Sequence, residues 1–122
     1  MMRKILMVVD DEADLLLVTS IRLKVAGYDV IEAVDGLKAL DLARQKAPDL
    51  IILDVYLPGM NGDEVARQLK KEEKTKRIPI ILISADARTL KERSGMCGAD
   101  GYLFKPFEST ELLGMIEKYI PA

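Results

Sequence analysis

The sequence contains no histidine and a single cysteine, Cys97. Without histidine the chain cannot form a Ser-His-Asp or Cys-His catalytic site, and it lacks the commonest general base. A single cysteine excludes an intrachain disulfide, and a chain without a Cys/His cluster has no zinc site of the usual kind. We interpret Cys97 as a small buried residue. These absences exclude histidine-dependent hydrolases and zinc proteins from the functions that the chain can have.

The sequence also lacks a long apolar run and an excess of one charge. The apolar part of its amino terminus, Ile5 to Val9, is too short for a signal peptide or a membrane span. We therefore expect a cytoplasmic protein with no membrane partner. With 18 basic and 20 acidic residues the net charge is −2, which does not indicate nucleic-acid binding. The lysine-rich residues 70–77 include Glu72 and Glu73 and are typical of a solvated helix end, so we expect no direct nucleic-acid binding.

Apolar segments alternate with segments of helical periodicity along the chain. The predicted strands are residues 5–9, 28–33, 50–54, 78–83 and 101–104, and the predicted helices are residues 13–26, 35–47, 62–74, 86–96 and a last one capped by Ser109 or Thr110. Strands joined by helical crossovers are parallel, and these crossovers are almost always right-handed. We predict an α/β fold, a doubly wound five-stranded parallel sheet of order 2-1-3-4-5. At 122 residues we expect a single domain, residues 1–122.

Polar side chains follow the predicted strands at the point where each strand ends. They are Asp10 and Asp11 after the first strand, Asp54 at the end of the third, Ser84 after the fourth and Lys105 after the fifth. Open parallel sheets place their ligand sites at this edge. Because the first and third strands are neighbours in the predicted order, we expect the three carboxylates to meet in one crevice.

This set of side chains indicates a metal-assisted reaction of a phosphoryl group. Three carboxylates at close range need a compensating positive charge, and all-oxygen ligation with room for water suits Mg²⁺ or Mn²⁺ rather than zinc. Lys105 adds a compact positive charge, and the Ser84 hydroxyl can donate to an anion. Asp54, which is ionised at neutral pH, would be the nucleophile that accepts the phosphoryl group.

With these residues in place, the sequence resembles the receiver domain of two-component response regulators, the family that includes the chemotaxis regulator, from about Lys4 to Ile120. The resemblance is carried by Asp10-Asp11, Asp54, the run Leu57-Pro58-Gly59-Met60-Asn61-Gly62, Ser84, Tyr102 and Lys105-Pro106. It implies the flavodoxin-like (βα)5 receiver fold. It also implies that Asp54 is the phospho-acceptor and that Asp10 and Asp11 form the acidic pocket.

The resemblance assigns roles to the other residues of the motif. Lys105 would bind the phosphoryl group, the peptide bond before Pro106 would be cis, and Ser84 and Tyr102 would be the switch residues. The expected Mg²⁺ ligands are Asp11, Asp54 and the backbone carbonyl of Tyr56, with Asp10 acting through water. Ser84 stands where threonine is commoner, and Tyr56 is bulky at a position that influences how easily water reaches the phosphoryl group.

The predicted function is Mg²⁺-dependent transfer of a phosphoryl group from a phosphohistidine to Asp54. The donor would be a histidine kinase or a histidine phosphotransfer protein. Movement of Ser84, Lys105 and Tyr102 would reshape an interaction surface made by the fourth helix, fifth strand and fifth helix, which a downstream protein effector would bind. The chain is expected to be a signalling switch and not an enzyme, since it would catalyse only its own phosphorylation and autodephosphorylation.

The first predicted helix carries apolar residues on two faces. Leu15, Val18, Leu23 and Ala26 form one stripe, and Leu17, Ile21 and Val25 form another. Only one face can pack squarely on the sheet, so the second is either peripheral packing or a docking surface. We hypothesise that Leu17, Val18 and Ile21 belong to the docking face for the kinase or phosphotransfer protein, because this helix borders the predicted site.

Two alternative functions stay under consideration. An aspartyl-phosphate phosphatase of the haloacid dehalogenase type would need an Asp-x-Asp-x-Thr/Val pattern after its first strand, where this chain has Asp10-Asp11-Glu12-Ala13-Asp14. A receiver-like interaction module that acts without phosphorylation usually loses the acceptor or the pocket acids, and this chain has all of them.

Overall fold

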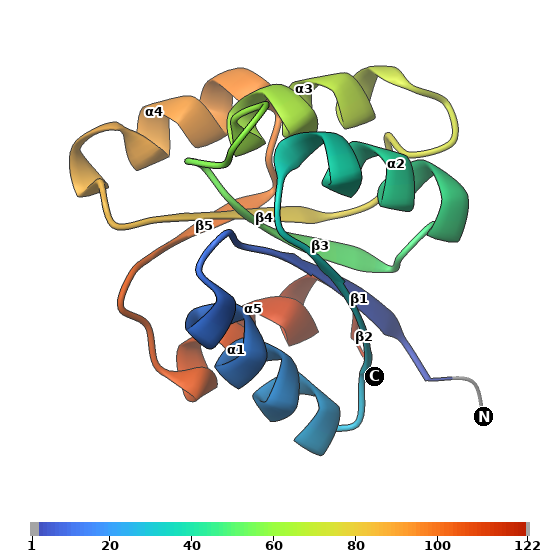
Figure 1. Ribbon diagram of the computed structural model, residues 1–122, viewed down its shortest axis with the longest axis vertical. Helices are drawn as coiled ribbons and strands as arrows, with labels where there is room; N and C mark the ends of the chain where they lie inside the picture. Colours follow the sequence, from blue (N-terminus) through green and yellow to red (C-terminus); the bar gives the residue numbers. More distant parts are fainter. Residues whose placement is uncertain (1–2, 122) are drawn as a thin grey trace.

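The structure is a computed structural model that describes residues 3–121, so the ends of the predicted domain, Met1, Met2 and Ala122, lie outside the described residues. Strands and helices alternate along the chain (Figure 1). The strands are β1 (Ile5–Val9), β2 (Asp29–Ala33), β3 (Leu50–Asp54), β4 (Ile80–Ser84) and β5 (Gly101–Phe104). The helices are α1 (Ala13–Val25), α2 (Gly36–Lys46), α3 (Gly62–Lys71), α4 (Ala87–Cys97) and α5 (Ser109–Tyr119).

The strands form one parallel sheet in the order β2-β1-β3-β4-β5, which confirms the predicted topology. Helices α1 and α5 cover one face of the sheet, and α2, α3 and α4 cover the other (Figure 1). This arrangement follows from right-handed crossovers. The step from β1 to β2 runs one way along the sheet and places α1 on one face, and the steps from β2 to β3, β4 and β5 run the other way and place α2, α3 and α4 on the opposite face. Each crossover also returns the chain to the same end of the sheet, so the strands are parallel. All five strands therefore end at one edge.

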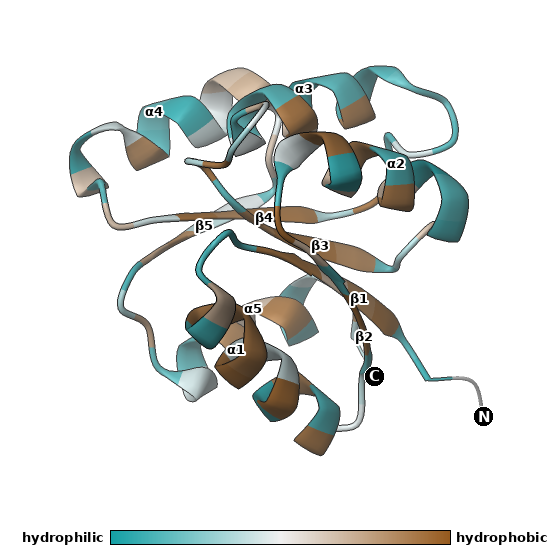
Figure 2. Cartoon of the chain, viewed as in Figure 1, coloured by the Kyte–Doolittle hydropathy of each residue, from teal (hydrophilic) through white to brown (hydrophobic). Residues whose placement is uncertain are grey.

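The central strands β3 and β4 are buried at every position because helices cover both of their faces. Ile51 and Leu53 pack among residues of α2, α3 and α4, whereas Leu50 and Ile52 pack among residues of α1 and α5. Figure 2 shows these strands as a hydrophobic layer between the helices. The outer faces of α2, α3 and α4 are mostly hydrophilic, whereas α1 also shows hydrophobic stretches. The continuous apolar run before Asp54 is thus a consequence of two-sided burial.

Helix α1 uses a different inner face from the one we predicted. Its buried residues are Leu16, Thr19, Ser20 and Leu23, so only Leu23 of the expected inner stripe is correct. The helix carries apolar side chains around most of its circumference, and periodicity alone therefore did not identify the buried face. The second stripe is not packed: Leu17 is 56% exposed and Ile21 is 50% exposed.

The ends of α1, α2 and α4 differ from the prediction by one residue, and the end of α3 and the cap of α5 differ in ways that the contacts explain. Helix α3 ends at Lys71, three residues early, and the Thr75 hydroxyl donates to the Leu69 carbonyl in the turn that follows. Helix α5 is capped by Glu108 and not by Ser109 or Thr110. Glu108 and Glu111 form a reciprocal capping box, which satisfies two backbone N–H groups at the start of the helix.

Two other expectations, those for Cys97 and for Pro106, are confirmed. Cys97 is buried, with 2% of its surface exposed, and the Lys105–Pro106 peptide bond is cis. None of the helices within residues 3–121 is long and apolar enough to cross a membrane.

Candidate functional site

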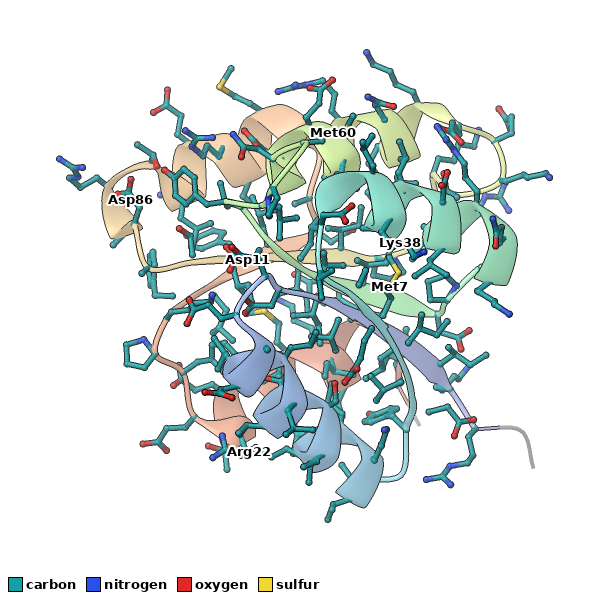
Figure 3. The ribbon with its side chains drawn as sticks, in the orientation of Figure 1. Met7, Asp11, Arg22, Lys38, Met60 and Asp86 are labelled. Carbon is teal, nitrogen blue, oxygen red and sulfur yellow. The ribbon has the colours of Figure 1, made fainter. Side chains whose placement is uncertain are left out.

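The three predicted carboxylates come together at the edge where β1 and β3 end. Val9 pairs with Leu53, so the residues that follow them, Asp10 and Asp54, stand side by side. One carboxylate oxygen from each of Asp10, Asp11 and Asp54 lies within 4.8 Å of the others. Asp10 and Asp54 are buried, whereas Asp11 is exposed at the mouth of the site (Figure 3). The expectation of one acidic crevice is confirmed in geometry.

Lys105 provides the positive charge at this crevice. Its Nζ donates to Asp54 Oδ2 at 2.5 Å and to Asp10 Oδ2 at 3.2 Å. The Lys105 backbone N–H donates to the Ser84 carbonyl at 3.0 Å, which extends the pairing of β4 with β5 by one residue. The end of β5 thereby carries the amine across the end of β4 to the carboxylates of β1 and β3.

The charges at the site change how these groups titrate. Burial raises the pKa of the Asp54 carboxyl, and the charge of Asp10 raises it further, which together outweigh the hydrogen bonds from Lys105 and from the Tyr56 backbone. Burial by itself lowers the pKa of Lys105, but the hydrogen bond and charge of Asp54, with the charge of Asp10, more than offset it, so the pKa of Lys105 is raised. The two shifts have different main causes: burial raises the pKa of Asp54, whereas the hydrogen bond and charge of Asp54, with Asp10, raise the pKa of Lys105.

An open pocket of about 760 Å³ leads from solvent to Asp54. It is lined by Asp11, Glu12, Asp54, Tyr56, Ser84, Ala85, Asp86, Ala87, Arg88 and Lys105. Ser84 is 2% exposed, and its Oγ accepts the backbone N–H of Asp86 at 3.0 Å. The hydroxyl hydrogen of Ser84 is therefore still free to be donated to an anion in the pocket.

Tyr56 has contacts that the sequence analysis did not anticipate. Its backbone N–H donates to Asp54 Oδ1 at 3.2 Å, and its hydroxyl donates to Asp86 Oδ2 at 3.2 Å. The guanidinium carbon of Arg93 lies 5.3 Å from the centre of its ring. Asp86 and Arg93 were not among the predicted site residues. The one signal for Asp86 in the sequence is that it follows the strand-end Ser84 by two residues.

Tyr102 is the one predicted site residue of β4 and β5 that does not reach the pocket. Its ring is partly buried against the residues of α2, α3 and α4 and meets Phe104 edge to face, with 5.8 Å between ring centres. Phe104 is 44% exposed. The structure therefore brings together the acids, Ser84 and Lys105. Tyr102 lies outside this group, two positions before Phe104 on the outer strand β5.

The donor set fits a hard divalent cation. All three side chains that converge are carboxylates, which Mg²⁺ and Mn²⁺ prefer. Asp11 is open to solvent, which leaves room for the bound waters that Mg²⁺ retains. Asp10 and Asp54 are held alike. Each accepts one backbone N–H, from Glu12 at 3.0 Å and from Tyr56 at 3.2 Å, and each also accepts from Lys105.

Comparison with known proteins finds one family across most of the chain. A family model for the response regulator receiver domain matches residues 6–117. The DNA-binding dual master transcriptional regulator RpaA of Synechocystis sp. is 40% identical over 112 residues, which are 91% of this chain and 46% of that protein. The phosphate regulon transcriptional regulatory protein PhoB of Pseudomonas aeruginosa is 39% identical over 118 residues, 96% of this chain and 52% of that protein. The chain spans about half the length of these curated relatives.

Solved structures agree with this finding. A response regulator from Chloroflexus aurantiacus superimposes with a TM-score of 0.93 at 31% identity, covering 99% of this chain and 100% of that one. The chemotaxis response regulator CheY4 of Vibrio cholerae has a TM-score of 0.90 at 31% identity, covering 98% and 100%. The receiver domain of the sensor histidine kinase PA1611 of P. aeruginosa, with magnesium coordinated in its active-site cleft, has a TM-score of 0.92 at 29% identity, covering 99% and 100%.

The relatives contradict the expectation that no nucleic-acid partner is involved. RpaA is named as a DNA-binding protein, and PhoB as a transcriptional regulatory protein. The expectation relied on the balanced charge of these 122 residues. That balance carries no information about the half of each relative that lies outside the match, and the conclusion drawn from it was wrong.

Proposed function

The chain belongs to the response regulator receiver domain family, and we propose that Asp54 is its phospho-acceptor, which takes a phosphoryl group from a phosphohistidine in a Mg²⁺-dependent reaction. One observation carries the proposal: three carboxylates and Lys105 converge at the strand ends, with Asp54 at the bottom of an open pocket. As a receiver domain of two-component response regulators, the chain is a signalling component. Its self-catalysed phosphorylation and dephosphorylation are part of the proposal.

The transfer is a displacement at phosphorus. An oxygen of the Asp54 carboxylate forms a bond to phosphorus as the bond from phosphorus to the donor's imidazole nitrogen breaks, and the electron pair of that bond stays on the imidazole. Lys105 Nζ already contacts Asp54 Oδ2, so it is placed to hold an oxygen of the transferred group. The Ser84 hydroxyl, on the pocket wall, donates to another oxygen.

The proposed metal ligands are Asp11, Asp54 and the backbone carbonyl of Tyr56, with Asp10 acting through water. The convergence of the carboxylates supports this set, as does the magnesium in the cleft of the similar PA1611 receiver domain. A bound Mg²⁺ ion supplies positive charge that offsets the charge of the phosphoryl oxygens. Without it, Lys105 is the cation that contacts both buried acids, at 2.5 and 3.2 Å.

Phosphorylation would act as a switch through Ser84, Lys105 and Tyr102. The new phosphoryl oxygens attract the Ser84 hydroxyl and the Lys105 amine, and the space beside Ser84 then allows the Tyr102 ring to move inward and change the surface of α4, β5 and α5. Changing a population from 1% to 99% active needs about 5.5 kcal/mol of differential stabilisation. Charge-assisted hydrogen bonds from Ser84 and Lys105, together with repacking of Tyr102, are of the size to supply it.

We propose that the phosphohistidine donor docks on α1 through Leu17, Val18 and Ile21. All three are exposed, Val18 by 43%, so they are not peripheral packing. Val18 also lines a groove of about 310 Å³ that continues to Pro106, Phe107 and the pocket residue Lys105. A helical donor lying in this groove would bring its phosphohistidine to Asp54.

The docking proposal is tested with Leu17→Glu combined with Ile21→Lys. The matched control is Leu37→Glu on α2, because Leu37 has the same 56% exposure as Leu17. With a histidine kinase chosen because it labels the wild-type chain, the double variant should lose labelling while Leu37→Glu keeps it. Labelling by acetyl phosphate, which needs no docking surface, should be equal in all three proteins. Equal labelling by the kinase would exclude this surface.

The acceptor proposal is tested by incubating the chain with acetyl phosphate, with Mg²⁺ or with EDTA, and measuring the intact mass. The wild type should gain one phosphoryl group only with Mg²⁺, and Asp54→Asn should gain none. Asp29→Asn, which changes an exposed acid at the far end of β2, is the control and should behave as wild type. Failure of the wild type to gain mass would favour an interaction module without phosphorylation, and repeated turnover of unrelated phosphoesters would favour a phosphatase.

We also propose that the chain forms one domain and works in the cytoplasm. A single sheet with helices on both faces supports the first statement. The second is supported by the relatives that act on DNA, which is located there in bacteria.

A further inference from the structure

The ring of Tyr56 is held along one face of α4 by two residues, the N-cap residue Asp86 and the helix residue Arg93. Asp86, at the helix start, accepts the Tyr56 hydroxyl, and the Arg93 guanidinium lies over the ring. These residues are seven positions apart, which places them on the same face of a helix. Figure 3 shows Asp86 at the start of α4, close to the mouth of the site. The Tyr56 side chain is thus held by a hydrogen bond at its hydroxyl group and by a cation–π contact on one face of its ring.

Arg93 is itself held by another element. Its Nη1 donates to Asp63 Oδ2 at 2.9 Å, and Asp63 lies in the first turn of α3. The two side chains are only 32% and 17% exposed, so water screens this pair less than a surface salt bridge. The ion pair with Asp63 therefore fixes the position of the Arg93 guanidinium. Through this guanidinium α4 contacts both α3 and the Tyr56 ring.

Tyr56 forms part of the pocket wall, and its hydroxyl contacts Asp86, another residue of that wall. Tyr56 lines that pocket together with Asp54, Ser84 and Lys105, and its backbone N–H contacts Asp54 directly. Its side chain is 45% exposed, so a change in ring position opens or closes space above Asp54 without disturbing the core.

We propose that Arg93 is a positioning residue that, anchored by Asp63, holds the Tyr56 ring over the pocket and so limits access of water to phosphorylated Asp54. The proposal rests on the proposed function of Asp54 as phospho-acceptor. It adds that the α3–α4 ion pair sets the lifetime of the phosphorylated form. Neither Arg93 nor Asp63 contacts the reacting atoms.

The reaction that the Tyr56 ring would slow is hydrolysis of the aspartyl phosphate at Asp54. The oxygen of water forms a bond to phosphorus while the bond from phosphorus to the Asp54 oxygen breaks. The electron pair returns to the Asp54 carboxylate, the phosphoryl group leaves as inorganic phosphate, and a water proton passes to that product or to solvent. A ring that covers the entrance excludes the attacking water.

The test measures loss of the phosphoryl group after excess acetyl phosphate is removed. Arg93→Gln removes the cation over the ring, and the matched control is Arg67→Gln, an arginine of α3 that pairs with Glu64 and has a similar exposed fraction. Dephosphorylation of Arg93→Gln should be about two- to five-fold faster than wild type, the size expected from a cation–π contact at a partly exposed site. Arg67→Gln should dephosphorylate at the wild-type rate.

The same substitution made in a Tyr56→Leu protein distinguishes an effect on the position of the Tyr56 ring from a general loss of stability. In Tyr56→Leu there is no ring to hold, so adding Arg93→Gln should change the rate no further. An unchanged rate in the single Arg93→Gln variant, or the same acceleration in the Tyr56→Leu background, would overturn the proposal.

A third measurement does not depend on phosphorylation. The ring resonances of Tyr56 in a ¹H–¹³C NMR spectrum should shift in Arg93→Gln and in Asp63→Asn, and stay in place in Arg67→Gln. If wild type accepts no phosphoryl group, the proposed function fails, and the ring resonances alone then decide whether Arg93 positions Tyr56. Resonances that do not move in Arg93→Gln contradict the positioning role.

Discussion

Lys105 Nζ lies 2.5 Å from Asp54 Oδ2 although 51 residues separate them in the sequence. The same amine contacts Asp10 at 3.2 Å, 95 residues away. Its side chain is 12% exposed, and both acids are almost fully buried. One lysine therefore acts as the internal counter-ion for two buried carboxylates, with Asp11 as a third acid beside them. The stability and the cation affinity of this domain should both depend on that amine.

Lys105→Met should lower the free energy of unfolding in EDTA by about 1–3 kcal/mol, because two buried carboxylates lose their hydrogen-bond donor. The same variant should bind Mg²⁺ more tightly than wild type, because the ion no longer competes with the amine. Urea unfolding in EDTA and in a Mg²⁺ series measures both quantities. Lys91→Met, at an exposed position of α4, should change neither. Weaker Mg²⁺ binding by Lys105→Met would contradict this account.

The raised pKa of Asp54 gives a pH dependence with a defined sign. In EDTA the folded state holds the proton of Asp54 more tightly than the unfolded state, so this group contributes stability at low pH that is lost as pH rises through its folded pKa. Wild type should therefore gain stability relative to Asp54→Asn as pH falls from neutral toward 3.8, the ordinary aspartate value. Mg²⁺ needs the ionised carboxylate, so Mg²⁺ affinity should fall over the same range and binding should release protons. Calorimetric titration in two buffers of different ionisation enthalpy measures that release.

The strand order of the sheet could be predicted because each strand is marked in the sequence by a short apolar run. The run before Asp54 is apolar at successive positions since β3 is covered on both faces, and helical segments between strands leave only parallel pairing. The acidic site followed from topology, because parallel strands deliver their carboxyl ends to one edge. Asp10, Asp11, Asp54 and Lys105 could therefore be assigned together.

Features that depend on three-dimensional contacts were not predictable in the same way. Helix α1 is apolar around most of its surface, so its periodicity did not distinguish the buried Leu16 from the exposed Leu17. Arg93 contacts the Tyr56 ring although the two residues are 37 positions apart in the sequence. Nothing in the sequence around either residue indicates this contact. The relation to DNA-binding proteins could not be inferred from the charge of these residues alone.

Tyr56→Phe should raise the pKa of Asp86. Burial by itself raises that pKa, but the hydrogen bond from the Tyr56 hydroxyl and the one from the Arg88 backbone outweigh it and hold the pKa below its usual value. Removing the hydroxyl removes one of these donors and keeps the ring. The ¹³C carboxyl resonance of Asp86, followed through a pH titration, measures the change. An unchanged pKa would mean that the hydroxyl does not donate to Asp86 in solution.

Gly62→Ala should be far more damaging than an alanine elsewhere in a helix, because α3 begins against the backbone of the acceptor. A methyl carbon added at Gly62 would lie 1.9 Å from the Asp54 carbonyl oxygen, whereas one added at Gly114 in α5 would meet nothing within 4 Å. Gly62→Ala should therefore destabilise by about 1–3 kcal/mol, the usual cost of overpacking, and slow labelling by acetyl phosphate by displacing Asp54. Gly114→Ala should stabilise by about 0.5–1 kcal/mol through helix propensity and leave labelling unchanged. Urea unfolding and intact-mass labelling of both variants decide the matter, and a Gly62→Ala protein with wild-type stability and labelling would show that the start of α3 is not constrained by Asp54.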